Sequence, residues 1–143
     1  SWAAVEYHRA RRDQDELRER LGKAFWDWGI PTVASLVEVV QSVNLPVIAS
    51  GGVRSGIDVA KALALGASLA SMASPILPQA TKDEKEVKKE LQLVLEELRN
   101  AMFLVGAGSV EEIKAVPAVI TGKTAEWLRI RGFHPQTYAK RKM

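Results

Sequence analysis

The chain of 143 residues contains no cysteine, which excludes disulfide bonds, thiolate metal sites and cysteine nucleophiles. Aromatic residues make up only 6% of it, and 20 basic residues against 17 acidic ones leave a net charge of +3. Such a small surplus, without a long stretch of one sign, argues against nucleic acid as a partner. The apolar runs are far shorter than the ~20 residues of a membrane helix, and no signal-peptide pattern is present. We therefore expect a cytoplasmic protein without a membrane partner.

Hydrophobic residues make up 47% of the chain and charged residues 26%, which is the balance of a folded domain and excludes a disordered segment. The first residues, Ser1 to Ala4, include no initiator methionine and no clear start of an element. We expect from this that the chain is cut from a longer protein.

Apolar periodicity and capping residues predict helices that alternate with short strands. In order, we expect helices over 13–28 and 30–43, a buried strand over 45–50, a helix over 56–65 between Ser55 and Gly66, a strand over 67–72 and a long helix over 83–105. A capping box from Ser109 to Glu112 predicts a short helix, Thr121 or Thr124 caps a last one, and the tail from Gly132 to Met143 is expected to fray.

Strands that alternate with helices predict a parallel sheet with helices on its outside. Two strands alone would leave their faces and edges exposed, so further strands are required. They come either from another polypeptide or from the rest of a larger barrel or doubly wound domain, and the cut N-terminus favours the second.

One segment has the residue types of an anion site. Gly51 and Gly52 follow the first strand and allow the backbone to approach a ligand closely, while Arg54 adds a forked donor. Ser55 and Gly56 then begin a helix, whose first amides carry partial positive charge. The alternative interpretation is an ordinary strand-to-helix turn, which needs glycine only for its backbone angles and not for a ligand.

A second loop follows the next strand, and it includes Ala73 and Ser74. Adjacent parallel strands bring their C-terminal loops together, so the two loops are expected to bind one phosphate group. A Rossmann dinucleotide site is disfavoured, because the glycines read G-G-V-R-S-G and not G-x-G-x-x-G.

Four segments together resemble the type 2 isopentenyl-diphosphate isomerase family, flavin-dependent (β/α)8-barrel enzymes of isoprenoid synthesis. They are SWAAVEYHRAR at 1–11, FWDWGIPT at 25–32, PVIASGGVRSGIDVAKALALGA at 46–67 and AMFLVGAGSVEEIKAVPAVITGKTAEWL at 101–128. The resemblance implies an α/β fold, the C-terminal part of a (β/α)8 TIM barrel. Residues 1–30 would be the loop and helix after barrel strand six, 31–105 the last βα units with the FMN phosphate loops, and 106–143 C-terminal helices and a tail.

The resemblance also implies the site residues. The FMN phosphate would be held by Gly51, Gly52, Val53, Arg54, Ala73 and Ser74. Trp2 and Glu6 would lie over the substrate side of the flavin as the catalytic candidates, and no metal ligand is assigned. The second loop departs from the family's Gly-Met-Ala-Leu pattern, because Ser71 and Ser74 replace its first and last residues. Backbone contacts would survive this change.

The implied reaction interconverts isopentenyl and dimethylallyl diphosphate with reduced FMN and Mg2+, and NADPH reduces the flavin. The Mg2+ ligand and the diphosphate site would lie in the N-terminal half of the enzyme, which is the expected partner, within a homo-oligomer. This chain alone is expected to be inactive. Two alternatives stay open: part of an FMN-dependent 2-hydroxy-acid oxidoreductase, and a non-catalytic phosphate-binding half-barrel.

Overall fold

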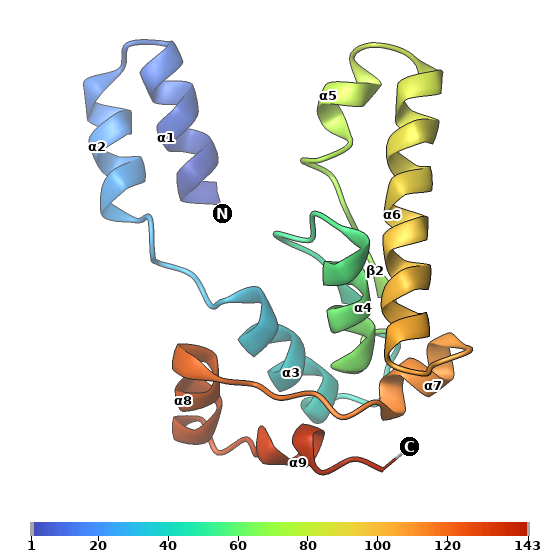
Figure 1. The fold of residues 1–143 in the computed structure, drawn as a ribbon. Coiled ribbons are helices and arrows are strands. Elements are labelled where there is room, and N and C mark those ends of the chain that lie inside the picture. Colours follow the sequence, from blue (N-terminus) through green and yellow to red (C-terminus); the bar gives the residue numbers. More distant parts are fainter. Residues whose placement is uncertain (1, 143) are drawn as a thin grey trace. The chain divides into compact units, whose positions relative to one another are not determined.

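A computed structural model of the protein describes residues 2–142, and the side chains of residues 3–142 (Figure 1). The chain divides into two compact units, one that ends at Pro31 and one that begins at Thr32. Within residues 2–142, no helix is long and apolar enough to cross a membrane.

The first unit is a pair of helices, α1 (Trp2–Arg12) and α2 (Glu16–Ala24). The predicted single helix over 13–28 is therefore wrong at both ends, and α1 was not expected. Gln14 has a left-handed φ of 55°, which separates the two helices, and the Asp15 carboxylate then caps α2 by accepting from the Arg18 amide at 3.0 Å. Gly22 is buried where α2 meets α1: a Cβ there would lie 2.8 Å from the Tyr7 nitrogen.

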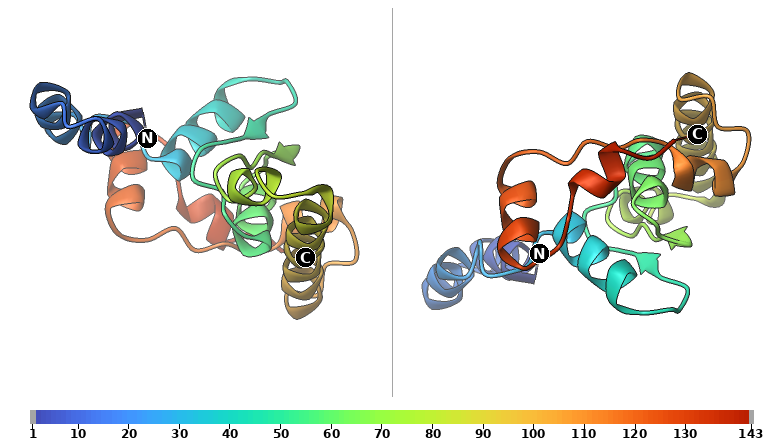
Figure 2. Two further views of the ribbon diagram at one scale, coloured as in Figure 1. Left: turned by 90° about the horizontal axis from the view of Figure 1, so that it is seen from above. Right: turned by 90° about the horizontal axis from the view of Figure 1, so that it is seen from below.

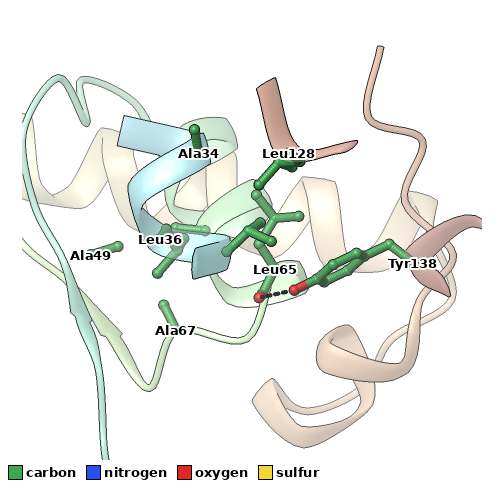
Figure 3. Close-up of a cluster of buried hydrophobic side chains, with 9 residues drawn as sticks. Ala34, Leu36, Ala49, Leu65, Ala67, Leu128 and Tyr138 are labelled. Carbon is green, nitrogen blue, oxygen red and sulfur yellow. Dashed lines mark hydrogen bonds between the residues drawn. The ribbon is translucent and has the colours of Figure 1, made fainter. Parts of the chain in front are cut away.

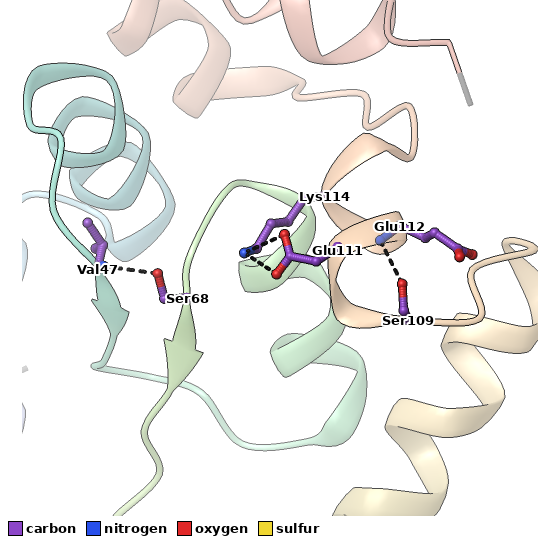
Figure 4. Close-up of polar contacts among 6 residues, drawn as sticks. All are labelled: Val47, Ser68, Ser109, Glu111, Glu112 and Lys114. Carbon is purple, nitrogen blue, oxygen red and sulfur yellow. Dashed lines mark hydrogen bonds and ion pairs between the residues drawn. The ribbon is translucent and has the colours of Figure 1, made fainter.

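The second unit contains the two strands and the remaining helices. They are α3 (Thr32–Ser42), β1 (Ile48–Ala49), α4 (Gly56–Ala64), β2 (Leu69–Ala70), α5 (Leu77–Ala80), α6 (Glu84–Leu104), α7 (Val110–Ala115), α8 (Gly122–Ile130) and α9 (Gln136–Ala139). Ser55 caps α4 as expected, and Asp83, where the long helix was expected to begin, caps α6. The Ser109 hydroxyl accepts from the Glu112 amide at 3.2 Å at the start of α7 (Figure 4). The predictions of α3, α4, α6, α7 and α8 are thus confirmed to within a few residues.

The strands β1 and β2 pair in parallel, with Ile48 opposite Leu69 and Ala49 opposite Ala70. Both strands are drawn as arrows in Figure 2. Beside this pair, the Ser68 hydroxyl accepts from the Val47 amide at 3.3 Å (Figure 4). The predicted strands are confirmed in place and direction, but each is shorter than expected. Ile48 is 59% exposed and Leu69 is 61% exposed, so the sheet lacks the cover that a buried parallel sheet requires.

The main core of this unit joins α3, α4 and both strands to the C-terminal helices (Figure 3). Its buried members are Ala34, Leu36, Val37, Ala49, Ala62, Leu65, Ala67, Leu128 and Tyr138. The expectation of a frayed tail is wrong, because Tyr138 is 2% exposed and its hydroxyl donates to the Leu65 carbonyl at 3.4 Å. Arg141 also donates to the Ala64 carbonyl, at 2.5 Å. The tail thus satisfies carbonyl groups that the end of α4 leaves without helical partners.

A polar contact holds α3 to α8. The Glu38 carboxylate accepts from the Trp127 indole at 2.8 Å and forms an ion pair with Arg131 at 3.2 Å. The pKa of Glu38 lies below its ordinary value of 4.5, mainly because of the hydrogen bond from Arg131 and secondly because of the hydrogen bond from Trp127. The carboxylate is therefore held in its charged form.

Candidate phosphate-binding site

Two loops meet at the carboxyl end of the parallel strands. The first, residues 50–55, connects β1 to α4 and is called the phosphate loop below. The second, residues 71–76, follows β2, and its Ser71 amide donates to the Ala49 carbonyl at 2.8 Å. Because Ala49 and Ala70 are paired, the two loops leave the sheet side by side. The expected juxtaposition of these loops is confirmed.

The phosphate loop depends on two glycines in the left-handed region, Gly51 with φ of 92° and Gly52 with φ of 80°. A side chain would be strained at either position. An added Cβ at Gly52 would still meet no atom within 4 Å, so the space beside it is open to a ligand.

Backbone amides on both loops are free to bind an anion. Within the described part of the chain, no group accepts a hydrogen bond from the amides of Gly52, Val53, Ala73 or Ser74. The Val53 side chain is buried, whereas Gly52, Ala73 and Ser74 are exposed. Such unpaired amides at the ends of adjacent strands fit the oxygen atoms of a phosphate group.

Two polar side chains that sequence analysis did not single out fasten the phosphate loop. The Thr32 hydroxyl, at the start of α3, donates to the Gly51 carbonyl at 2.7 Å. The Asp58 carboxylate accepts from the Arg54 amide at 3.1 Å. Asp58 stands three residues after Ser55, which is the spacing of a capping pair, so the sequence did contain a signal for it. The sequence contained no such signal for Thr32, because its partner lies 19 residues away.

Two of the first amides of α4 already have acceptors within the chain, contrary to the expectation that they would be available to a ligand. The Gly56 amide donates to the Glu97 carboxylate of α6 at 2.6 Å, and the Asp58 amide donates to the Ser55 hydroxyl at 3.2 Å. An anion at this site therefore depends on the amides of the loops more than on the helix terminus.

The remaining candidate residues are distributed over both units. Arg54 is exposed and forms no ion pair with another residue of the described part, so its guanidinium is free for an anion. Glu6 belongs to the first unit, where it pairs with Arg9 at 3.1 Å. The side chain of Trp2 lies outside the described part, and no group of three His, Asp or Glu side chains within residues 2–142 is placed to hold a metal ion.

A separate cavity of about 470 Å³ lies along α4, lined by residues that include Ile57, Ala60, Lys61 and Ala64. Its walls are apolar apart from Lys61 and two threonines, Thr121 and Thr124. A phosphate group requires several donors. The cavity therefore does not compete with the two loops as the anion site.

Comparison with known proteins bears directly on these loops. The model of the FMN-dependent dehydrogenase family matches residues 25–119, a stretch that includes both of them. The chain belongs to this family. Its α/β fold is part of a (β/α)8 barrel, with β1 and β2 as neighbouring barrel strands.

The chain is also similar to curated isopentenyl-diphosphate delta-isomerases. It is 53% identical over 141 residues to the one from Methanothermobacter thermautotrophicus, which covers 99% of this chain and 39% of that protein. It is 56% identical over 132 residues to the one from Pyrococcus furiosus, covering 92% of this chain and 33% of that protein. The chain thus spans between a third and two fifths of the length of these relatives.

Among solved structures, crystal structures of a mandelate oxidase are similar to this chain. The match has a TM-score of 0.57 and 38% sequence identity, and it covers 62% of this chain and 26% of the oxidase. The likeness supports the barrel fold and leaves nearly two fifths of this chain unmatched.

Proposed function

We propose that this chain is the C-terminal part of a type 2 isopentenyl-diphosphate isomerase, which interconverts isopentenyl and dimethylallyl diphosphate. The observation that supports this most is the extent of the similarity to the isomerases. It reaches 99% of the chain, whereas the dehydrogenase family model begins at residue 25. The first unit, which that model leaves largely unmatched, is therefore shared with the isomerases.

In this proposal the two loops hold the phosphate of FMN. The amides of Gly52, Val53, Ala73 and Ser74 supply donors without a partner of their own, and the Arg54 guanidinium adds charge-assisted hydrogen bonds. Gly51 contributes the left-handed turn that directs the amides of Gly52 and Val53. Reduced FMN would supply the acid and base of the isomerisation, and NADPH would keep it reduced. The residues of this chain bind and orient the cofactor.

The rest of the enzyme would come from its N-terminal part. Strands from that part would cover Ile48 and Leu69, which are exposed here. We assign the Mg2+ ligand and the diphosphate site to the same part. Glu6 and Trp2 are proposed to face the substrate side of the flavin, and the complete enzyme is proposed to be a cytoplasmic homo-oligomer.

A fused protein would test the proposal. It joins this chain to the part of the Methanothermobacter thermautotrophicus isomerase that precedes the segment matching it. We expect the fused protein to bind FMN more tightly than riboflavin, which lacks the phosphate, and to convert isopentenyl diphosphate with reduced FMN and Mg2+. Glu6→Gln should lower its turnover more than its affinity for FMN. A folded fusion that binds both flavins equally, or that binds FMN without isomerising, would contradict the proposal.

A 2-hydroxy-acid oxidoreductase is the second candidate, favoured by the match to mandelate oxidase. The match to mandelate oxidase covers 62% of this chain, whereas the match to the isomerase from Methanothermobacter thermautotrophicus covers 99% of it. The same fused protein separates the two, because oxidation of a 2-hydroxy acid consumes an electron acceptor, whereas isomerisation produces no net redox change. Flavin reduction by (S)-mandelate under anaerobic conditions would favour the oxidoreductase.

A further inference from the structure

The phosphate loop is also fastened at its far end, by a side chain from a different helix. Glu97 of α6 is half-buried, and its carboxylate accepts from the amide of Gly56, where the loop becomes α4, at 2.6 Å. The two residues are 41 positions apart in the chain. The contact therefore depends on the packing of α6 against α4.

That packing leaves no room for a side chain at Gly56. A Cβ on this glycine would lie 2.1 Å from the Val94 carbonyl oxygen and 2.5 Å from the Leu98 nitrogen. The start of α4 thus touches the backbone of α6, and the two helices run side by side in Figure 1. Glu97 lies on the turn of α6 that makes this contact, so the backbone sets the position of its carboxylate.

We infer that Glu97 is a positioning residue for the phosphate loop; this inference rests on the proposed function as an FMN-binding chain. The carboxylate satisfies the first amide of α4, for which the helix itself offers no acceptor. The loop is then held at its start by Thr32, in its middle by Asp58 and at its end by Glu97. A loop that is already ordered loses less conformational entropy when it binds a phosphate through Gly52 and Val53.

Two conservative variants of the fused protein separate the reach of this side chain from its charge. Glu97→Asp keeps the charge but withdraws the carboxylate by one methylene group, and Glu97→Gln keeps the reach and an acceptor oxygen. The measured quantity is the ratio of the dissociation constants for riboflavin and FMN, which isolates the contribution of the phosphate. Glu96→Asp is the matched control, because Glu96 is exposed and pairs with Arg99 on the surface of the same helix.

We expect Glu97→Asp to lower the ratio about tenfold, a loss near the upper end of that typical for one hydrogen bond, and to change riboflavin affinity little. Glu97→Gln and Glu96→Asp should keep the ratio within about twofold of the unsubstituted protein.

Three outcomes would overturn the inference. A ratio that falls in Glu97→Gln but not in Glu97→Asp would assign the effect to charge, and an unchanged ratio in both would remove any role in phosphate binding. A ratio that rises in both variants would mean that the carboxylate competes with phosphate. Failure of the proposed function is a different result, since the unsubstituted fusion would then show no preference for FMN over riboflavin.

Discussion

Individual residues of the phosphate loop divide into those that present donors and those that hold the loop in place. Gly52 and Val53 offer free amides, while Thr32, Asp58 and Glu97 hold the loop from outside. The donors follow from their position after a predicted strand, so sequence analysis could identify them. The contacts of Thr32 and Glu97 span 19 and 41 residues and depend on helix packing, for which the chain carries no local pattern.

Arg54 and Gly52 should affect flavin binding by different routes. Arg54→Ala in the fused protein should weaken FMN binding by about 1–3 kcal/mol, because one charged donor to the phosphate is lost. Gly52→Val should weaken it further, since a β-branched residue is strained at a φ of 80° and its side chain enters the open space. Flavin fluorescence titration measures both affinities. Unchanged affinity in both variants would refute the assignment of this loop to the phosphate.

Glu38 should make the stability of the second unit depend on pH. Hydrogen bonds from Arg131 and Trp127 lower the pKa of its carboxyl in the folded state, so its contribution is present above the unfolded pKa of about 4.5. The contribution is lost as the pH falls through the lower folded value. Glu38→Gln should therefore reduce the melting temperature of the fused protein at pH 7, and the difference should shrink below about pH 4.

The control for this prediction is Glu126→Gln, which removes an exposed carboxylate of α8. It should leave the melting temperature nearly unchanged at both pH values. A Glu38→Gln effect of equal size at neutral and acidic pH would indicate lost packing, not lost charge.

At the scale of elements, helices and strands were predicted best where a local signal marks their ends. Ser55, Asp83 and Ser109 cap α4, α6 and α7 as their sequence positions indicate. The division into α1 and α2 was not predicted, because Gln14 adopts a left-handed φ that is uncommon for its residue type. The tail was missed because Tyr138 owes its burial to contacts with α4, 73 residues earlier.

Two glycines set how closely pairs of helices approach, and replacing them should be costly. Gly56→Ala would place a Cβ 2.1 Å from the Val94 oxygen of α6, and Gly22→Ala one 2.9 Å from the Tyr7 Cα. We expect each variant to destabilise the fused protein by about 1–3 kcal/mol, with Gly56→Ala at the upper end. Gly29→Ala is the matched control, because its Cβ would meet nothing within 4 Å. Urea unfolding midpoints measure the differences, and equal midpoints for Gly56→Ala and Gly29→Ala would contradict the close packing.

For the whole molecule, the two strands are the feature that matters most. A parallel sheet of two strands, with Ile48 and Leu69 exposed, corresponds to a segment of a barrel. The alternation of strands and helices predicted a parallel sheet, and it left a barrel and a doubly wound domain open. The resemblance to the isomerase family implied the barrel. The placement of Glu6 over the flavin came from the resemblance alone, because Glu6 and the loops belong to different units and no local pattern links them.

The isolated chain should therefore lack both a cooperative transition and activity. Exposed strand edges and faces favour a loosely packed or aggregating state, so thermal unfolding should be broad and a dye such as ANS should bind. No isopentenyl diphosphate should be converted, even with excess reduced FMN and Mg2+. Adding the N-terminal part in trans should restore conversion. A sharp melt of the monomeric chain, or turnover above a control without protein, would contradict this expectation.

The helix α4 has consequences for the order in which the protein assembles. Its first amide is satisfied by Glu97, and its last carbonyl groups, at Ala64 and Leu65, accept from Arg141 and Tyr138. These three partners stand 41 to 77 residues further along the chain. Since long-range closures form slowly, a ribosome would have released most of the second unit before both ends of α4 were satisfied. The phosphate loop would then reach its ligand-ready form only after α6 has been synthesised and has packed against the start of α4.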